Sequence, residues 1–295
     1  AILALVNKGD EVIMPSPYWV SYSELVKIAG GTTVEVYAGI DSDFKITPEA
    51  LNKAITPQTK LIIYSSPCNP TGSVYSQEEL QALADVILQH EGIYVISDEI
   101  YEHINFVGKS SSIGTCAGML ERTVTVNGVS KAFAMTGWRL GYIGAPLWIA
   151  QACSKMQGQI TSGACTISQM AAKAALEADP AVIADMIHVF KSRRDRVYAG
   201  LITIPGLKVN LPEAAFYFYM DVTAFFNTTD GETVVKTSDD LAMYLLKKVY
   251  LATVGGEAFG DANCIRISYA TSEEMLDEAV KRLREGLSHL KPIAA

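Results

Sequence analysis

The stretch that decides the fold runs from residue 61 to residue 97 and reads LIIYSSPCNPTGSVYSQEELQALADVILQHEGIYVIS. It begins and ends with apolar runs, residues 61–64 and 93–97, which are typical of strands buried on both faces of a parallel sheet. Between them, residues 76–89 have an amphipathic pattern, and Ser76 with Glu79 forms the S-x-x-E signature of a helix start. A strand, a helix and a strand in this order predict a parallel α/β unit.

The same alternation continues on both sides of this stretch. Further strand-like runs lie at residues 11–14, 34–37, 123–126 and 141–144. They predict an α/β fold with a mostly parallel, doubly wound sheet, in a large domain that covers residues 1–146.

The pattern changes after Pro146. Long helical stretches cover residues 147–178, with a break near Ser162-Gly163, and residues 181–201. Shorter strands at 216–220 and 264–268 are accompanied by helical patterns at 238–250 and 272–290. We therefore expect an interdomain helical region over 147–180 and a smaller α+β domain over 181–295.

Composition narrows the class of protein. The chain has 295 residues, 24 Lys plus Arg against 32 Asp plus Glu, and therefore a net charge of −8. This acidic balance argues against a broad nucleic-acid or anionic-membrane surface, and no apolar run is long enough to span a bilayer. Five scattered cysteines without a C-x-x-C pair favour a reducing compartment, and four isolated histidines give no metal motif. We expect a cytoplasmic enzyme without a metal.

Polar residues follow two of the predicted strands, where an open α/β sheet collects its ligands. Asn69 lies in the turn SSPCNPTG after residues 61–64, and Asp98 and Tyr101 follow residues 93–97. A carboxylate and a phenol at this spacing can hold a cationic nitrogen and a phenolic oxygen around one ring. The alternatives are an ordinary turn at Asn69 and a helix N-cap at Asp98.

Basic and aromatic residues complete the candidate set. Lys131 follows residues 123–126 in small and apolar company, which lowers a lysine pKa and makes the amine nucleophilic. Arg139, eight residues on, offers a planar fork for phosphate or carboxylate. Trp19 follows residues 11–14 and could stack on a planar ligand or pack on a neighbouring helix. Arg266, between apolar residues, is expected to pair with a structural carboxylate or with a substrate.

A nucleophilic lysine, an acid, an amide, a phenol, a stacking aromatic ring and two arginines are the groups that pyridoxal phosphate chemistry requires. They can hold a planar phosphorylated aldehyde as a Schiff base and bind a carboxylate substrate. A nicotinamide dehydrogenase is the weaker alternative, because no G-x-G-x-x-G follows the first visible strand.

The motifs resemble the fold-type I, class I and II pyridoxal-phosphate aminotransferases over nearly the whole chain. The resemblance rests on GVSK with WRLG at 128–141, PCNPTG at 67–72, DEIY at 98–101 and RISY at 266–269, in this order. Residues 16–22, SPYWVSY, look most like the prokaryotic aspartate aminotransferase branch. The loop GGEAFG at 255–260 also resembles a small-domain loop near the substrate.

The resemblance implies a role for each cofactor residue. Lys131 should form the Schiff base with pyridoxal 5'-phosphate and later move a proton at the substrate. Asp98 should pair with the protonated ring nitrogen, and Asn69 and Tyr101 should hydrogen-bond the phenolic oxygen. Trp19 should stack on the ring.

The resemblance also implies how anions are bound. Arg139, helped by Ser130, should bind the cofactor phosphate, and Arg266 with Asn69 should bind the substrate α-carboxylate. Gly128 stands where some members carry a phosphate-binding hydroxyl, so that ligand must come from elsewhere.

The family resemblance extends to activity and assembly. It implies a ping-pong exchange of the amino group between L-aspartate and 2-oxoglutarate in a homodimer, with an amino acid and a 2-oxo acid as the partners. The alternatives are an aromatic, alanine or prephenate aminotransferase, a β-lyase, or a non-catalytic pyridoxal-binding module. The opening residues AILALVNKGD are typical of the last turns of a helix. We therefore expect that the N-terminal segment of the family, with its phosphate-binding turn, is missing from this sequence.

Overall fold

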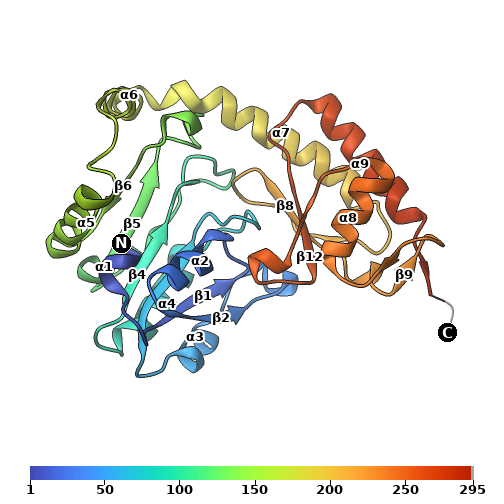
Figure 1. Cartoon of the computed structure of the whole chain (residues 1–295). Coiled ribbons are helices and arrows are strands. Elements are labelled where there is room, and N and C mark those ends of the chain that lie inside the picture. The colour runs from blue at the N-terminus through green and yellow to red at the C-terminus, as the bar shows by residue number, and fades with distance from the viewer. Residues whose placement is uncertain (294–295) are drawn as a thin grey trace.

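The computed structural model describes residues 1–293, and a six-stranded sheet is the centre of its N-terminal half (Figure 1). The sheet order is β2–β1–β3–β4–β5–β6. Its strands are β1 (Glu11–Ser16), β2 (Thr32–Tyr37), β3 (Thr59–Ser65), β4 (Tyr94–Asp98), β5 (Thr123–Gly128) and β6 (Gly141–Gly144). Neighbouring strands pair in parallel, except that β6 runs antiparallel to β5. The predicted mostly parallel α/β sheet is confirmed.

Helices cover both faces of this sheet. Successive side chains of a strand point to opposite faces, so each strand contributes residues to both cores. Val12 and Leu61 pack on the face covered by α1 (Ile2–Leu5), α2 (Ser21–Ile28) and α5 (Leu147–Ile160). Ile13 and Ile62 pack on the other face, against α3 (Pro48–Ala54) and α4 (Gln77–Leu88). Two-sided burial explains why these strands are apolar almost throughout.

Two local predictions hold at the residue level. The hydroxyl of Ser76 accepts from the N–H of Glu79, and the Glu79 carboxylate accepts from the N–H of Ser76, so α4 begins with a full capping box. The expected break in the next helical region is present between α5 and α6 (Thr166–Glu177), where Ser162 has a φ of +63° and Gly163 a φ of +149°.

The edge strand β6 and the helices after it expose an unusual amount of apolar surface. All four residues of β6 are exposed. Large apolar side chains of α5 and α6 are exposed as well, among them Leu147, Ile160, Ile167 and Met170. An open sheet edge beside exposed apolar helices is typical of a surface that another segment or chain covers.

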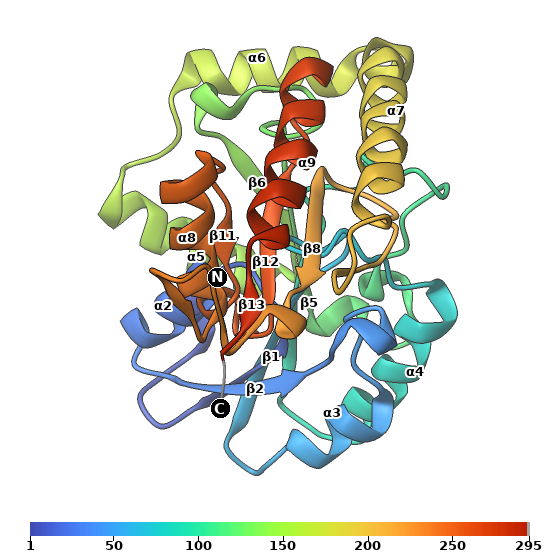
Figure 2. The same ribbon diagram turned by 90° about the vertical axis from the view of Figure 1, so that its right-hand side faces the viewer.

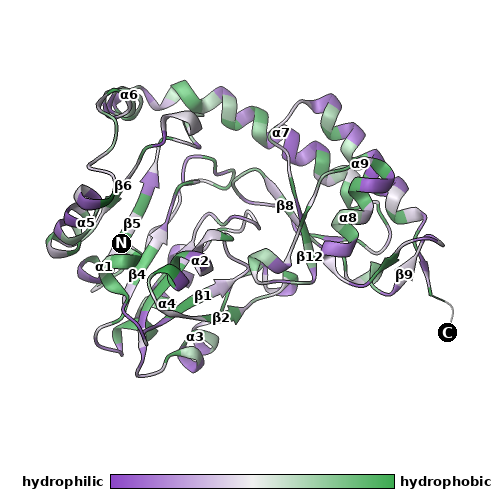
Figure 3. Ribbon diagram, viewed as in Figure 1, coloured by the Kyte–Doolittle hydropathy of each residue, from purple (hydrophilic) through white to green (hydrophobic). Residues whose placement is uncertain are grey.

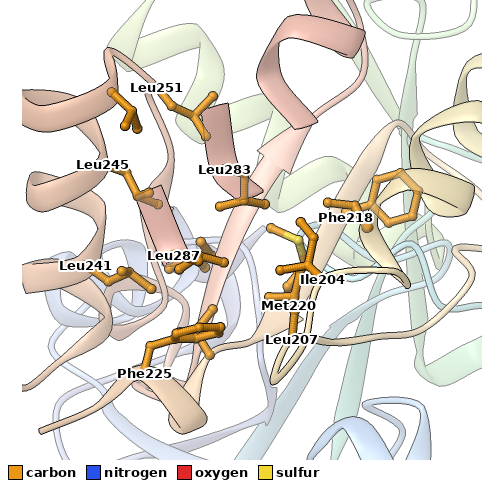
Figure 4. Packing of buried hydrophobic residues seen from close by; sticks show 14 of the residues in the cluster. Ile204, Leu207, Phe218, Met220, Phe225, Leu241, Leu245, Leu251, Leu283 and Leu287 are labelled. Atoms are coloured by element: carbon orange, nitrogen blue, oxygen red, sulfur yellow. The ribbon is translucent and has the colours of Figure 1, made fainter. Parts of the chain in front are cut away.

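The C-terminal half is built on a four-stranded antiparallel sheet in the order β11–β12–β8–β7. Its strands are β7 (Lys208–Val209), β8 (Tyr217–Asp221), β11 (Val254–Gly255) and β12 (Cys264–Ser268). It packs against α7 (Ala184–Leu201), α8 (Ser238–Val249) and α9 (Glu273–Ser288) through the core drawn in Figure 4, which includes Phe218, Leu245 and Leu283.

The remaining elements are short. A three-stranded sheet has the order β10–β9–β13, with β9 (Thr228–Thr229), β10 (Val234–Val235) and β13 (Lys291–Pro292). The 3₁₀ helices are Ile40–Ser42, Ile113–Thr115, Leu120–Arg122, Thr136–Trp138, Pro180–Ile183, Thr223–Phe225 and Glu257–Phe259.

The helices α7 and α9 pack side by side in the C-terminal half. Figures 1 and 2 show α7 and α9 side by side above the strands β8 and β12. In Figure 3 both helices mix hydrophilic and hydrophobic residues along their length, as helices with one buried face do.

No helix within residues 1–293 is long and apolar enough to cross a membrane. The domain limits at 146 and 180 stay a prediction.

Candidate active site

The predicted site residues gather where three parallel strands end. β3 ends at Ser65, four residues before Asn69; β4 ends at Asp98; and β5 ends three residues before Lys131. Since β3, β4 and β5 are neighbours and run in parallel, these ends share one edge of the sheet. β12 of the C-terminal half brings Arg266 to the same place, within hydrogen-bond distance of Asn69.

Asp98 is the last residue of β4 rather than the residue after it, so the strand is shifted by one from the predicted 93–97. Its Oδ2 accepts from the Tyr22 hydroxyl at 2.6 Å, and its Oδ1 accepts from the N–H of Ile100 at 3.2 Å. Within the described chain no helix begins at Asp98, so the N-cap alternative is wrong. Burial raises the pKa of Asp98, which the bond from Tyr22 and the charge of Lys131 oppose.

Lys131 is half-buried and faces aromatic rings. Its Nζ lies 5.7 Å from the ring centroid of Tyr101 and 5.9 Å from that of Phe216. Burial, and then the positive charge of Arg266, lower the pKa of Lys131, while Asp98 acts in the opposite direction. The amine is therefore neutral, and nucleophilic, at lower pH than an exposed lysine.

Arg266 is held without a carboxylate partner. Its guanidinium carbon lies 4.5 Å from the ring centroid of Tyr217 and 4.8 Å from that of Phe259. One guanidinium nitrogen donates to Oδ1 of Asn69 at 2.8 Å. None of the ion pairs formed within residues 1–293 includes Arg266, so of the two expected partners, a structural carboxylate or a substrate, the first is absent there. A partly buried guanidinium in this state is suited to an anionic ligand.

The turn that carries Asn69 is fixed by the C-terminal half. Asn69 is buried, and two residues of the segment before β8, Glu213 and Ala214, donate their N–H groups to the carbonyl of Gly72 at 3.0 Å. Gly72 has a φ of +73°, and a Cβ there would lie 2.6 Å from Cβ of Pro212. Glycine is required for this close approach. The turn is therefore packed tightly against the segment before β8.

The other predicted residues lie at the rim of this set. Arg139 is exposed, with a φ of +52°, and donates to the carbonyl of Thr136 at 3.0 Å; its charge also lowers the pKa of Lys131. Ser130 is partly buried next to Lys131 in the chain. Trp19 is 39% exposed, and its ring meets the ring of Tyr22 edge-on at 5.5 Å.

Three residues near the site were not singled out individually from the sequence. Tyr22 is the last residue of the SPYWVSY stretch at 16–22, which could have revealed it. Phe259 lies inside the GGEAFG loop that the family resemblance indicated. Tyr217 carries no local signal, since its partners Tyr101 and Arg266 are distant in the sequence.

The comparisons with known proteins decide the family. A family model described as aminotransferase class I and II matches residues 1–283. The chain belongs to this family. Among its relatives, the bifunctional aspartate aminotransferase and glutamate/aspartate-prephenate aminotransferase of Petunia hybrida is 45% identical over an alignment of 297 positions. That alignment covers 99% of this chain and 62% of the Petunia protein. The aspartate/prephenate aminotransferase of Nitrosomonas europaea is 44% identical over 97% of this chain and 73% of its own length.

The fold of the aminotransferase class I and II chain is also found in solved structures. The crystal structure of the aspartate aminotransferase from Rhizobium meliloti superposes with a TM-score of 0.95 at 40% identity. That match covers 98% of this chain and 73% of the Rhizobium chain. The chain therefore spans 62–73% of the length of these aminotransferases.

Class I and II aminotransferases use pyridoxal phosphate, and the residues present fit this cofactor. Asp98 is a partly buried carboxylate whose close contacts in the described chain are neutral donors, which leaves it available to a protonated ring nitrogen. Lys131 is an amine with a lowered pKa, suited to an aldehyde. Arg139 presents an exposed guanidinium whose one hydrogen bond in the described chain is to a carbonyl, which suits a phosphate.

Proposed function

We propose that this chain carries the pyridoxal phosphate site of an aminotransferase that moves an amino group between L-aspartate and 2-oxoglutarate. The observation that carries the proposal is Lys131, a half-buried amine with a lowered pKa between the charges of Asp98 and Arg266. A neutral amine beside one anion and one cation is suited to attack an aldehyde and then to transfer a proton at a bound amino acid.

When bound, pyridoxal phosphate supplies an aldehyde that links to amines and a ring that accepts electrons. Lys131 would hold the cofactor through Nζ and would carry a proton to and from the substrate. Asp98 would pair with the ring nitrogen. Tyr101 and Asn69 would donate toward the phenolic oxygen, and Trp19 would pack on the ring.

Anion binding is divided between two arginines. Arg139, with Ser130, would bind the phosphate group of the cofactor. Arg266 binds the α-carboxylate of the substrate with two parallel hydrogen bonds, and Asn69, already in contact with its guanidinium, helps to orient it. Because the aromatic rings of Tyr217 and Phe259 hold the plane of Arg266, this carboxylate site is preorganised.

Aspartate is the proposed amino donor because relatives at 44–45% identity are named for it. The same names support a second candidate, transamination of prephenate, a larger substrate that accepts the amino group at its 2-oxo acid group. Arg266 and Lys131 serve both substrates equally, so the choice rests on the side-chain end of the substrate site.

The test is a visible absorption spectrum of the chain with pyridoxal phosphate, before and after each amino donor. We expect a yellow band that bleaches with aspartate and returns with 2-oxoglutarate. Lys131→Ala should abolish the band, whereas Lys173→Ala, which removes an exposed lysine paired with Glu177, should leave it unchanged. A wild-type chain without a band, or a band that survives in Lys131→Ala, contradicts the proposal.

The same assay separates the alternatives. Bleaching with glutamate followed by recovery with prephenate, phenylpyruvate or pyruvate identifies a prephenate, aromatic or alanine aminotransferase. Release of pyruvate and ammonia without an amino acceptor identifies a β-lyase. A band that no amino acid changes identifies a binding module.

We also propose a homodimer, as the family resemblance implies. The exposed apolar side chains of α5 and α6, such as Ile167 and Met170, support it, because such surfaces are typical of interfaces. Light scattering after size exclusion tests it: a mass of about 32 kDa, that of the single chain, contradicts the dimer. The cytoplasmic location expected from the cysteine pattern stays a prediction.

A further inference from the structure

Tyr217 touches two of the candidate site residues at once. It is the first residue of β8 and is 7% exposed. Its hydroxyl oxygen lies 2.9 Å from the hydroxyl oxygen of Tyr101, and its ring centroid lies 4.5 Å from the guanidinium carbon of Arg266. One side chain therefore joins the residue proposed to face the cofactor to the residue proposed to bind the substrate.

The hydrogen bond between the two phenols has a direction that the proposed function fixes. Within the described residues, each hydroxyl has the other as its one hydrogen-bond partner. A phenol has a single hydrogen to donate. If Tyr101 donates to a ligand held at Lys131, its hydrogen is used there, and Tyr217 must be the donor between the two tyrosines.

We infer that Tyr217 is a positioning residue that couples the cofactor site at Tyr101 to the substrate site at Arg266. Its hydroxyl donates to Tyr101, and its ring fixes the plane of the Arg266 guanidinium. The inference rests on the proposed function, since it gives Tyr101 a ligand to bind.

Each half of this role has a physical basis. A phenol that accepts a hydrogen bond becomes a stronger donor, because hydrogen bonds in a chain polarise one another. Tyr217 therefore strengthens the bond that Tyr101 makes to an anionic oxygen. The guanidinium of Arg266 lies near two aromatic rings, those of Tyr217 and Phe259, and one of its nitrogens donates to Asn69. These contacts hold the guanidinium in place, and its remaining N–H donors can bind a carboxylate.

Two substitutions separate the hydroxyl from the ring. Tyr217→Phe removes the hydroxyl and keeps the ring beside Arg266, whereas Tyr217→Leu removes both. The first readout is the pH titration of the visible band of the chain loaded with pyridoxal phosphate, which reports the cofactor site. The second is the dissociation constant of the unreactive dicarboxylate succinate, followed by its effect on the same band.

We expect Tyr217→Phe to raise the midpoint of the titration by about 0.3–1 pH unit, because a weaker donor at Tyr101 stabilises the deprotonated form less. Its succinate affinity should stay within about twofold of the wild type. Tyr217→Leu should also weaken succinate binding, by about tenfold. The matched control is Tyr244→Phe, which removes a buried hydroxyl bonded to the carbonyl of Gly286 and should change neither readout.

The outcomes keep the two proposals apart. A wild-type chain that gives no band with pyridoxal phosphate contradicts the proposed function, and this inference with it. A wild-type band whose titration is the same in Tyr217→Phe overturns only the inference drawn for the hydroxyl. Succinate binding that Tyr217→Phe and Tyr217→Leu weaken equally overturns the role of the ring.

Discussion

The hydrogen bond from Tyr22 to Asp98 offers a quantitative test of the electrostatics of the site. Tyr22→Phe removes one hydroxyl from a buried ring and leaves the ring in place. The bond is 2.6 Å long and ends on a carboxylate. A hydrogen bond to a charged group contributes about 1.5–3 kcal/mol to stability, so the substitution should cost that amount where Asp98 is ionised.

The cost should depend on pH in a definite direction. Burial already places the folded-state pKa of Asp98 above its unfolded value. The stability that this group contributes is therefore fully present below the unfolded pKa and is lost as the pH rises through the folded pKa. Without the donor from Tyr22 the folded pKa rises further, so more stability is lost at neutral pH. We expect a deficit of about 1.5–3 kcal/mol near pH 8 and a clearly smaller one near pH 4.

Urea unfolding followed by circular dichroism at both pH values measures this deficit. The matched control is Tyr75→Phe, which removes a buried hydroxyl that accepts from the N–H of Ile46 at 2.9 Å. Its cost, about 0.5–1.5 kcal/mol, should be the same at both pH values, because its hydrogen-bond partner is neutral. A deficit for Tyr22→Phe that is equal at the two pH values, or larger near pH 4, would refute the idea that Tyr22 stabilises the ionised carboxylate.

Four further predictions follow from particular contacts. Gly72→Ala should lower the free energy of unfolding in urea by about 2–5 kcal/mol, through backbone strain plus the clash with Pro212. The control Gly92→Ala, at φ +78° with open space around it, should lower it by about 1–2 kcal/mol, through strain alone. Equal costs would exclude the clash. Lys131 should react with acetic anhydride at lower pH than a free lysine peptide, as peptide mass spectrometry can follow; coincident profiles would contradict its lowered pKa. Arg266→Lys should weaken aspartate binding by about tenfold or more without changing cofactor affinity. The reason is that a lysine lacks the planar guanidinium and its contacts with the rings of Tyr217 and Phe259. Equal loss of both affinities would place Arg266 in the cofactor site. The 295-residue chain alone should bind a hydrophobic dye and aggregate on heating, because the edge strand β6 and the apolar side chains of α5 and α6 are exposed. A cooperative, fully reversible thermal unfolding transition would count against this.

The central sheet could be predicted because its chemistry is local. A strand buried on both faces must be a short apolar run, and β1, β3 and β4 are such runs in the sequence as well as in the structure. The end of β4 was missed by one residue for a tertiary reason. Asp98 continues the strand because it pairs with Ser65 across the sheet, although aspartate is a poor strand former.

The short strands of the C-terminal half could not be found this way. β9, β10 and β13 have two residues each, and two residues carry no periodicity. They exist because partners from distant parts of the chain meet there. β13, for example, pairs with β9 about 60 residues earlier.

The same distinction, between local patterns and contacts of distant segments, applies to the candidate site. Asn69, Asp98 and Lys131 could be placed together from the sequence, since the carboxyl ends of neighbouring parallel strands share one edge. The surroundings of Arg266 could not, because its contact with Asn69 spans 197 residues of sequence. Sequence reasoning therefore recovers the groups that one sheet presents, and misses those that the second half of the chain brings to them.

The charges of the site argue for a particular kind of ligand. Asp98, Lys131 and Arg266 are buried or half-buried, yet no ion pair of the described chain joins any of them to an opposite charge. Burying unpaired charges destabilises a fold, and natural sequences accept that cost mainly at functional sites. One carboxylate, one amine and one guanidinium are matched by a cationic ring nitrogen, an aldehyde and a carboxylate. A pyridoxal cofactor with an amino acid supplies all three, whereas a nucleotide or a simple anion leaves Asp98 without a cationic partner.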